Sequence, residues 1–254
     1  ELDCTGTPDA VITGTITGGF GPYIYEVSIN GAAYAALGAA VTPYTYTTAS
    51  PGTYQFRITD ANGCQVVSNI ITIDPLTTPS FTETHTNVSC NGGSDGSIVV
   101  TASGGIAPYE YSRDNGLNFQ TSNVFNGLIA GAYDVVVRDS KSCVSPATLV
   151  TITEQLSLAG TGAVTGLTCG AGNTTQEAIV TITATAGTGT SPYTYSFDGG
   201  VNYTSTNTYS TYTSGTVSAY VKDANGCFIG PIDVIIPALD PPVITTITGT
   251  PIYC

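Results

Sequence analysis

One pattern occurs three times in this chain, and it limits the possible folds more than any other feature of the sequence. Its centre is Pro-Tyr-x-Tyr, with a glycine-containing turn before it and an Asn-Gly or Asp-Gly type of turn after it, at residues 22–25, 108–111 and 192–195. A second shared segment closes each copy, running from a glycine through an aspartate to a cysteine, at residues 52–64, 131–143 and 215–227. Ordered self-similarity of this kind indicates one structural unit repeated along the chain. We therefore predict three copies of one small domain.

The residue composition favours strands over helices. Val, Ile, Thr and Tyr are abundant, Met and Trp are absent, and only 9% of the residues are charged. The runs 11–17, 98–102 and 179–185 alternate apolar and polar positions in part, as half-buried strands do. Short strands separated by regular turns are typical of β-sandwiches, so we predict an all-β protein made of tandem immunoglobulin-like β-sandwich repeats in an extended array. The predicted core positions are Tyr54, Phe56, Ile58, Tyr133, Val135, Val137, Val217, Ala219 and Val221.

Proline- and glycine-rich stretches mark the junctions between the copies, at residues 75–79, 160–166 and 237–242. They divide the chain into a first repeat (residues 1–76), a second repeat (77–157), a third repeat (158–239) and a tail (240–254). The tail matches an opening strand without a body, so we predict either the start of a fourth repeat or a donor strand that completes another subunit. The first residue is Glu1 and the pattern breaks off at the last residue. We expect the chain to be a window of a longer or processed polypeptide.

The charge balance excludes two classes of partner. The formal net charge is −13, with five Lys and Arg residues and one His. Nucleic acids and anionic lipid surfaces attract clusters of positive charge, which this chain does not have. No run approaches the roughly 20 apolar residues of a membrane-spanning helix. We expect no nucleic-acid binding and no membrane insertion.

The seven cysteines follow the repeat. Cys4, Cys90, Cys169 and Cys254 open units, whereas Cys64, Cys143 and Cys227 close them. Two pairings fit this order: within each unit (Cys4–Cys64, Cys90–Cys143, Cys169–Cys227), or across the junctions (Cys64–Cys90, Cys143–Cys169, Cys227–Cys254). If the first and last strands of a sandwich run in parallel, its two cysteines lie at one pole, within the Cα separation that a disulfide allows. We therefore predict the pairing within each unit, with Cys254 unpaired. Such bridges indicate an oxidising, extracytoplasmic compartment.

The residues needed for most enzyme chemistry are missing. His85 is the only histidine, and no nucleophile, zinc or phosphate-binding motif accompanies it, so we predict a solvated linker residue and no enzymatic activity. We assign no catalytic residue, cofactor or metal ligand. Asp60, Asp139 and Asp223 recur four residues before the closing cysteines. We predict that each forms an Asx turn, and calcium binding is the alternative.

The tyrosines of the Pro-Tyr-x-Tyr motifs have two possible roles. Aromatic faces with a polar edge suit sugars, so the pairs could form a glycan-contact surface. Strand alternation points one tyrosine of each pair inward, which makes packing the first expectation. The residues concerned are Tyr23, Tyr25, Tyr109, Tyr111, Tyr193 and Tyr195.

The second copy resembles a known repeat. Residues 88–97 (Val-Ser-Cys-Asn-Gly-Gly-Ser-Asp-Gly-Ser), 104–111 (Gly-Gly-Ile-Ala-Pro-Tyr-Glu-Tyr), and the segments beginning at 131 and 139 are similar to the SprB repeat of large Bacteroidota surface adhesins. The first and third copies depart from it, with residues 5–9 and 170–176 in place of the Gly-Gly-Ser-Asp-Gly turn. The resemblance implies export by the type IX secretion system, display at the cell surface with outer-membrane attachment, and a role in adhesion or gliding.

Together these observations lead to one predicted function and two alternatives. We predict a structural stalk or filament segment of a secreted cell-surface adhesin, whose partners are neighbouring repeats or subunits of the same filament. The first alternative is a pilus-like fibre subunit joined to the next by strand donation. The second is a glycan-binding module with a surface polysaccharide as its ligand.

Overall fold

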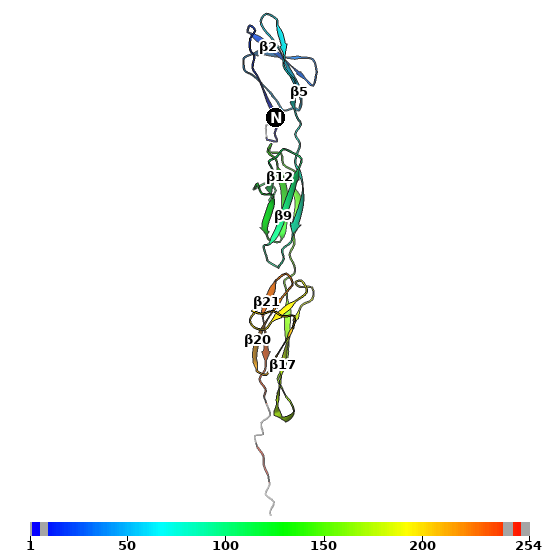
Figure 1. The fold of residues 1–254 in the computed structure, drawn as a ribbon, viewed down its shortest axis with the longest axis vertical. Coiled ribbons are helices and arrows are strands. Elements are labelled where there is room, and N and C mark those ends of the chain that lie inside the picture. Colours follow the sequence, from blue (N-terminus) through cyan, green and yellow to red (C-terminus); the bar gives the residue numbers. More distant parts are fainter. Residues whose placement is uncertain (1, 6–9, 241–245, 250–254) are drawn as a thin grey trace, which may run out of the picture. The chain divides into compact units, whose positions relative to one another are not determined.

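The computed structural model describes residues 2–5, 10–240 and 246–249 (Figure 1). Within these residues the chain is all-β, as predicted, and its helical structure is limited to the three-residue 3-10 helix η1 (Ala171–Asn173). No helix in the described part of the chain has the length and apolar character needed to cross a lipid bilayer.

The strands pair within three separate stretches, residues 10–73, 80–152 and 160–236, which we describe as the first, second and third repeats. In the first repeat, β2, β3, β5, β6 and β7 form one sheet, and β1 pairs with β4 in another. The strands are β1 (Ala10–Gly14), β2 (Tyr23–Ile29), β3 (Ala35–Ala40), β4 (Tyr44–Thr48), β5 (Gly52–Thr59), β6 (Gln65–Val67) and β7 (Ile71–Ile73).

The second and third repeats share one plan of two three-stranded sheets, in the orders β11-β9-β8 with β10-β12-β13, and β14-β17-β19 with β18-β20-β21. The strands of the second repeat are β8 (Ser80–Thr86), β9 (Gly96–Ser103), β10 (Glu110–Ser112), β11 (Val124–Leu128), β12 (Gly131–Arg138) and β13 (Thr148–Ile152). Those of the third are β14 (Gly160–Thr165), β17 (Ala178–Ala184), β18 (Thr194–Ser196), β19 (Thr208–Thr211), β20 (Gly215–Lys222) and β21 (Phe228–Ile236), with a small hairpin of β15 (Thr168–Cys169) and β16 (Thr175–Gln176).

The first repeat differs from this plan at one edge. Strands β9 and β17 each have a neighbour on both sides, whereas β1 pairs only with β4 among the described residues. In the described part of the first repeat, no strand lies beside β1 in the place that β8 has beside β9 and β14 has beside β17. One edge of β1 therefore has no hydrogen-bonded strand there.

Alternating apolar residues build the cores. In β5 every second residue from Tyr54 to Ile58 is buried, as the sequence predicts. The predicted core positions Tyr54, Phe56, Ile58, Val135, Val137, Ala219 and Val221 are buried, whereas Tyr133 and Val217 are half-buried. Burial of these side chains stabilises each repeat by about 1.5–3 kcal/mol per large apolar residue.

Hairpin turns have the backbone conformation expected from their residues. Asn30 and Gly31 begin the connection between β2 and β3 (residues 30–34), and both have positive φ angles, 54° and 74°. Two-residue hairpin turns of this type need positive φ at both positions, which Asn and Gly adopt at low cost. The positive φ angles predicted from the Asn-Gly dipeptide are confirmed, although the connection is longer than a two-residue hairpin loop.

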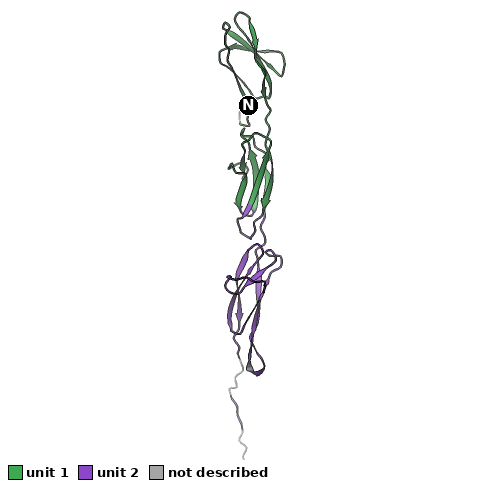
Figure 2. Ribbon diagram, viewed as in Figure 1, with its two compact units in different colours: residues 1–86, 97–127, 131–152 green, residues 87–96, 128–130, 153–254 purple. Residues whose placement is uncertain are grey.

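The chain divides into two compact units (Figure 2). The first contains residues 1–86, 97–127 and 131–152, and the second contains residues 87–96, 128–130 and 153–254. The loop 87–96 of the second repeat thus belongs to the same compact unit as the third repeat. The domain boundaries at residues 76, 157 and 239 stay a prediction. Most of the predicted opening or donor strand, including Cys254, lies outside the described residues.

Candidate functional site at the disulfides

Two disulfides join cysteines of successive repeats. Cys4 of the first repeat is bonded to Cys143 of the second, and Cys90 of the second repeat is bonded to Cys227 of the third. The paired residues are 139 and 137 positions apart in sequence. The Cys4–Cys143 bridge lies within the first compact unit, and the Cys90–Cys227 bridge lies within the second. The predicted pairing within each unit is therefore wrong, and the alternative across the junctions is not observed either.

The position of the opening cysteine explains the error. The predicted pairing requires Cys90 to lie at the start of the first strand, at the same pole as Cys143. Strand β8 comes before Cys90, however, and pairs antiparallel with β9, with Ser80 opposite Ser103 and Thr86 opposite Ser97. Cys90 therefore lies in the β8–β9 loop, at the end of the hairpin away from Ser103. Cys143 follows β12, in a loop bonded to Ile106, which comes just after Ser103, so the two cysteines of one repeat lie at opposite poles.

A sequence signal for this arrangement was present. Phe81, Glu83 and His85 alternate with threonines between the junction and Cys90, and this alternation indicates a strand. A strand in that place puts the opening cysteine at the far pole. His85 itself lies in β8, exposed, with its Nδ1 3.1 Å from Glu83 Oε2. The prediction of a linker position for His85 is wrong.

Each closing cysteine belongs to a loop organised by an aspartate, which we call the Asp–Cys loop (residues 60–64, 139–143 and 223–227). One carboxylate oxygen of Asp139 accepts the N–H groups of Lys141 and Cys143, both at 2.9 Å. The other accepts the N–H of Ile106 at 3.0 Å. Asp60 and Asp223 make the same three types of bond. The predicted Asx turns are confirmed, and the carboxylates also fix the glycine turn that precedes Pro-Tyr-x-Tyr.

This network has electrostatic and steric consequences. The N–H of Cys64 and the other backbone donors around Asp60 lower the pKa of that carboxyl below its ordinary value. Gly105, in the turn held by Asp139, has a φ angle of 59°, and a Cβ there would lie 2.8 Å from Asp139 Oδ2. Only glycine fits beside the carboxylate. No group of three or more His, Cys, Asp or Glu residues in the described ranges is placed to hold a metal ion, and calcium binding stays an untested alternative.

The first junction combines its disulfide with apolar packing. Leu2, two residues before Cys4, is 5% exposed. It lines a pocket with residues 72–77, which run from the end of β7 into the linker, and with Ile106 and Lys141 of the second repeat. The N–H of Cys4 donates to the carbonyl of Lys141 at 2.8 Å, next to the bridge. The segment that carries Cys4 is therefore held by a covalent bond, a backbone hydrogen bond and a buried leucine.

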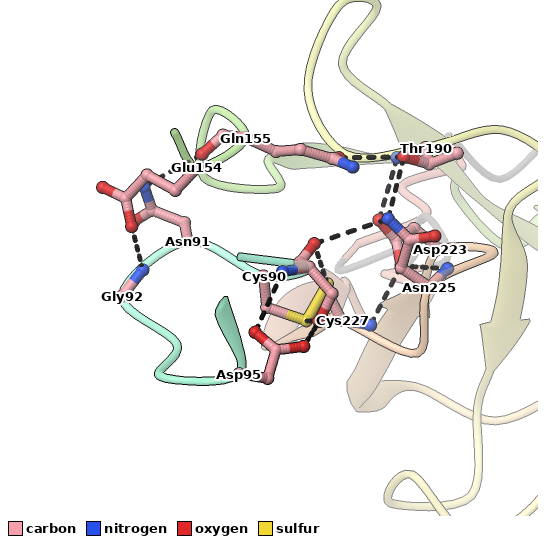
Figure 3. Close-up of a disulfide and its surroundings, with 11 residues drawn as sticks. Cys90, Asn91, Gly92, Asp95, Glu154, Gln155, Thr190, Asp223, Asn225 and Cys227 are labelled. Atoms are coloured by element: carbon pink, nitrogen blue, oxygen red, sulfur yellow. Dashed lines mark hydrogen bonds between the residues drawn. A yellow bond between two sulfur atoms is a disulfide. The ribbon is translucent and has the colours of Figure 1, made fainter. Parts of the chain in front are cut away.

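The second junction is more polar (Figure 3). Asn225, in the Asp–Cys loop of the third repeat, donates through Nδ2 to the carbonyl of Ser89 at 3.4 Å and to Thr190 Oγ1 at 3.2 Å. The loop 87–96 is also bonded to the linker, since Gly92 N donates to Glu154 Oε2 at 2.6 Å. Asn91 Nδ2 donates to the Gln155 carbonyl, and Gln155 Oε1 accepts from Thr190 Oγ1. Val88, two residues before Cys90, is 2% exposed.

The same short pattern precedes each opening cysteine in the described chain. An apolar residue stands two positions before it, in Leu2-Asp3-Cys4, Val88-Ser89-Cys90 and Leu167-Thr168-Cys169, and we call these tripeptides the apolar-x-Cys segments. Two of the three are bonded to the Asp–Cys loop of the following repeat. Sequence reasoning did not find this pairing, although the shared spacing was visible.

The tyrosines named as glycan-contact candidates all have structural contacts. The first tyrosine of each motif donates its hydroxyl to a carbonyl of the glycine turn five residues earlier, from Tyr23 to Gly18, from Tyr109 to Gly104 and from Tyr193 to Thr188. The second ones, Tyr25, Tyr111 and Tyr195, are half-buried, and Tyr25 and Tyr195 pack against the cores. The packing role accounts for these positions, and glycan contact stays a prediction.

Most of the few cations lie against aromatic rings. Arg57, Arg138 and Lys222 lie 4.4, 3.9 and 3.7 Å from the ring centroids of Tyr34, Phe119 and Tyr203. Arg57 and Arg138 also pair across strands with Glu26 and Glu110 at 2.6 Å. Positive charge is thus engaged in contacts within the repeats.

Comparison with known proteins supports the resemblance found in the sequence. Residues 82–118 match the family model described as SprB repeat, so this part of the second repeat is similar to an SprB repeat. A solved structure described as Drosophila OTK, extracellular domains 3-5, is 12% identical, with 91% of this chain and 92% of that chain covered and a TM-score of 0.22. A search of curated protein sequences gave no match. The SprB repeat and the disulfides point to an extracellular or cell-surface protein.

Proposed function

We propose that this chain is a load-bearing stalk segment of a secreted cell-surface adhesin, exported by type IX secretion in a member of the Bacteroidota and acting in adhesion or gliding. The SprB repeat at residues 82–118 supports a surface adhesin. In this function the chain holds a binding region away from the cell and transmits force to it. No chemical step is required of its side chains.

The pairing of the disulfides is the observation that carries this proposal. Cys90 lies between Cys4 and Cys143 in sequence, and Cys143 lies between Cys90 and Cys227, so the two bridges interleave. Each junction is therefore crossed by the backbone and by a disulfide. A covalent bond that connects successive repeats limits the extension of the chain even when the repeats themselves unfold. This property suits a segment under tension and has no evident use in a ligand-binding module.

The experiment measures how strongly cells that produce the protein stay attached to a surface under flow. Cells that display the protein with Cys4→Ser and Cys143→Ser are compared with wild-type cells, at matched surface amounts. We expect adhesion without flow to be retained and detachment to occur at lower shear stress. The control is Leu149→Asp, at an exposed residue of β13. Equal loss of adhesion with and without flow would assign a binding role instead.

Strand donation is a second candidate, and the free edge of β1 favours it. An unpaired edge offers backbone N–H and C=O groups that an added strand can bond, and β1 has a partner only on its β4 side in the described chain. A synthetic peptide of residues 240–252 should then raise the melting temperature of the chain, whereas a scrambled peptide should not. No shift at saturating peptide would remove this candidate.

The glycan-binding module keeps its own test. Binding of the recombinant chain to a polysaccharide array, lost on Tyr25→Ala and Tyr111→Ala, would favour it. If the chain binds no polysaccharide on the array, the stalk proposal is retained.

A further inference from the structure

Among the described residues, two cysteines take no part in the two bridges. Cys64 and Cys169 are free thiols, and both are exposed. Cys64 closes the first repeat, in the position that Cys143 and Cys227 hold in the other repeats. Cys169 stands in the third apolar-x-Cys segment, in the position of Cys4 and Cys90. Each is therefore one half of the type of bridge that the chain forms twice.

The Asp–Cys loop around Cys64 matches one that is already bridged. Residues 60–64 and 223–227 have the same sequence, Asp-Ala-Asn-Gly-Cys. They also have the same internal hydrogen bonds, in which two backbone N–H groups donate to the aspartate carboxylate. In the second of these loops Asn225 donates to the carbonyl of Ser89, beside the bonded cysteine. Asn62 is the corresponding residue near Cys64, and it is exposed.

The surface around Cys64 is suited to an apolar residue. A groove there is lined by Ile16, Tyr23, Ile58 and Val66 together with Asp60 and Cys64. Val66 is 62% exposed. Phe20, 68% exposed, follows the glycine turn in the position that Ile106 holds in the pocket of Leu2 at the first junction.

The segment that carries Cys169 has the features of the bonded segments. Leu167 precedes it by two residues, as Leu2 and Val88 precede Cys4 and Cys90. Leu167 is half-buried and packs against the core of the third repeat, while Cys169 is exposed in the short strand β15. The thiol is thus held on a folded segment and is accessible.

We propose that Cys64 and Cys169 form a third bridge of the same type between two copies of this chain, with Leu167-Thr168-Cys169 of one copy on the Asp–Cys loop of Cys64 in the next. The first repeat then supplies the closing cysteine of the bridge and the third repeat supplies the opening cysteine, so that two copies are joined by a covalent bond. This inference goes beyond the proposed function, because it holds or fails whether or not the chain carries load.

The bond forms by thiol–disulfide exchange with a small-molecule disulfide such as oxidised glutathione. The Cys64 thiolate attacks one glutathione sulfur and releases one glutathione thiolate. The Cys169 thiolate of the second copy then attacks the Cys64 sulfur of the mixed disulfide and releases the other. Two protein thiols are oxidised, one glutathione disulfide is reduced to two thiols, and the two protons pass from the cysteines to the released glutathione.

Complementary variants test the proposal. Both carry Cys254→Ser, and one adds Cys64→Ser while the other adds Cys169→Ser. In a glutathione redox buffer each variant should stay at the monomer mass of 25.9 kDa, whereas their mixture should give dimers that a reductant separates. Peptic mapping of the dimer should identify a Cys64–Cys169 peptide. The proposal is overturned if the mixture stays monomeric, or if either variant forms dimers alone as fast as the mixture.

A second comparison separates docking from random collision of thiols. Phe20→Asp, placed in the Cys169→Ser variant, should slow dimer formation in the mixture at least about tenfold, because a charge replaces apolar surface at the contact. The rate at which Cys64 forms a glutathione adduct should not change. Leu149→Asp is the matched control and should leave both rates unchanged. Equal dimer rates for the two variants would contradict the docking step.

Discussion

The interleaved bridges predict an unusual response to stretching, in which the loss of both disulfides lengthens the chain far more than the two separate losses together. The shortest covalent path between the ends runs from residue 1 to Cys4, crosses to Cys143, returns along the chain to Cys90, crosses to Cys227 and continues to residue 254. Part of this path therefore runs backward through the second repeat. The variants that test it are Cys4→Ser with Cys143→Ser, and Cys90→Ser with Cys227→Ser, separately and combined.

The expected lengths follow from the sequence positions. At about 3.4 Å per residue, the fully extended chain with both bridges measures about 280 Å, and without bridges about 860 Å. With either bridge alone it measures about 390 Å. Each single loss thus adds about 110 Å, whereas the double loss adds about 580 Å. Bridges within each repeat would instead give increments that simply add, because their loops do not overlap.

Single-molecule stretching between terminal handles measures these lengths, in a background where Cys64, Cys169 and Cys254 are serine so that no other pairing forms. The unbridged chain serves as the internal length standard. If the increment of the double variant equals the sum of the single increments, the interleaved pairing and the reasoning from it are refuted.

Four further predictions concern single features. Asp114 accepts hydrogen bonds from Ser112 and Asn118, which lower its pKa to about 2, and the equivalent bonds of Asn202 and Ser196 lower the pKa of Asp198. Because both folded pKa values lie below the unfolded value, the two carboxylates stabilise the fold fully above about pH 4, and this stabilisation is lost as the pH falls towards 2. Asp114→Asn should therefore flatten this part of the stability–pH curve. Asp139→Asn should lower the free energy of unfolding by about 2 kcal/mol in denaturant titration, since an amide group would face the Ile106 N–H, while the exposed Asp134→Asn should leave it within about 0.5 kcal/mol. Cys4→Ser with Cys143→Ser should lower the free energy of unfolding by about 2–5 kcal/mol, because the bridge closes a loop of 139 residues; an unchanged denaturation midpoint would contradict this. In the same variant, NMR relaxation should show faster separate tumbling of the first and second repeats than in the oxidised chain, and identical relaxation would count against a stiff junction.

Local features could be predicted from the sequence because local chemistry determines them. The positive φ angles at Asn30 and Gly31 follow from the residue types alone. The Asx turn of Asp139 depends only on the four residues that follow it. Alternation in β5 placed Tyr54 and Phe56 in the core correctly, because a strand with one buried face shows a period of two.

The disulfide pairing could not be obtained in the same way, because it depends on which pole of the repeat each cysteine occupies. That choice rests on a single strand, β8, whose register with β9 places Cys90 at the far end of the hairpin. Once the strand is overlooked, the inferred pole is inverted and the pairing changes with it. The roles of Leu2 and Val88 were missed for the same reason, since each becomes meaningful only when its cysteine is placed at a junction.

The junctions, more than the repeats, distinguish this chain from a simple string of β-domains. A single backbone linker acts as a swivel, since rotation about a few bonds reorients everything beyond it. At the first junction the backbone of residues 73–79 is accompanied by the Cys4–Cys143 bridge, the bond from Cys4 N–H to the Lys141 carbonyl and the buried side chain of Leu2. Two covalent connections separated in space remove rotation about either one.

The opposite poles of the opening and closing cysteines make this possible, because each repeat then offers one cysteine to the repeat before it and one to the repeat after it. Cys64 is a closing cysteine and Cys169 is an opening one, so the proposed bridge between two copies of the chain would join the same two kinds of cysteine.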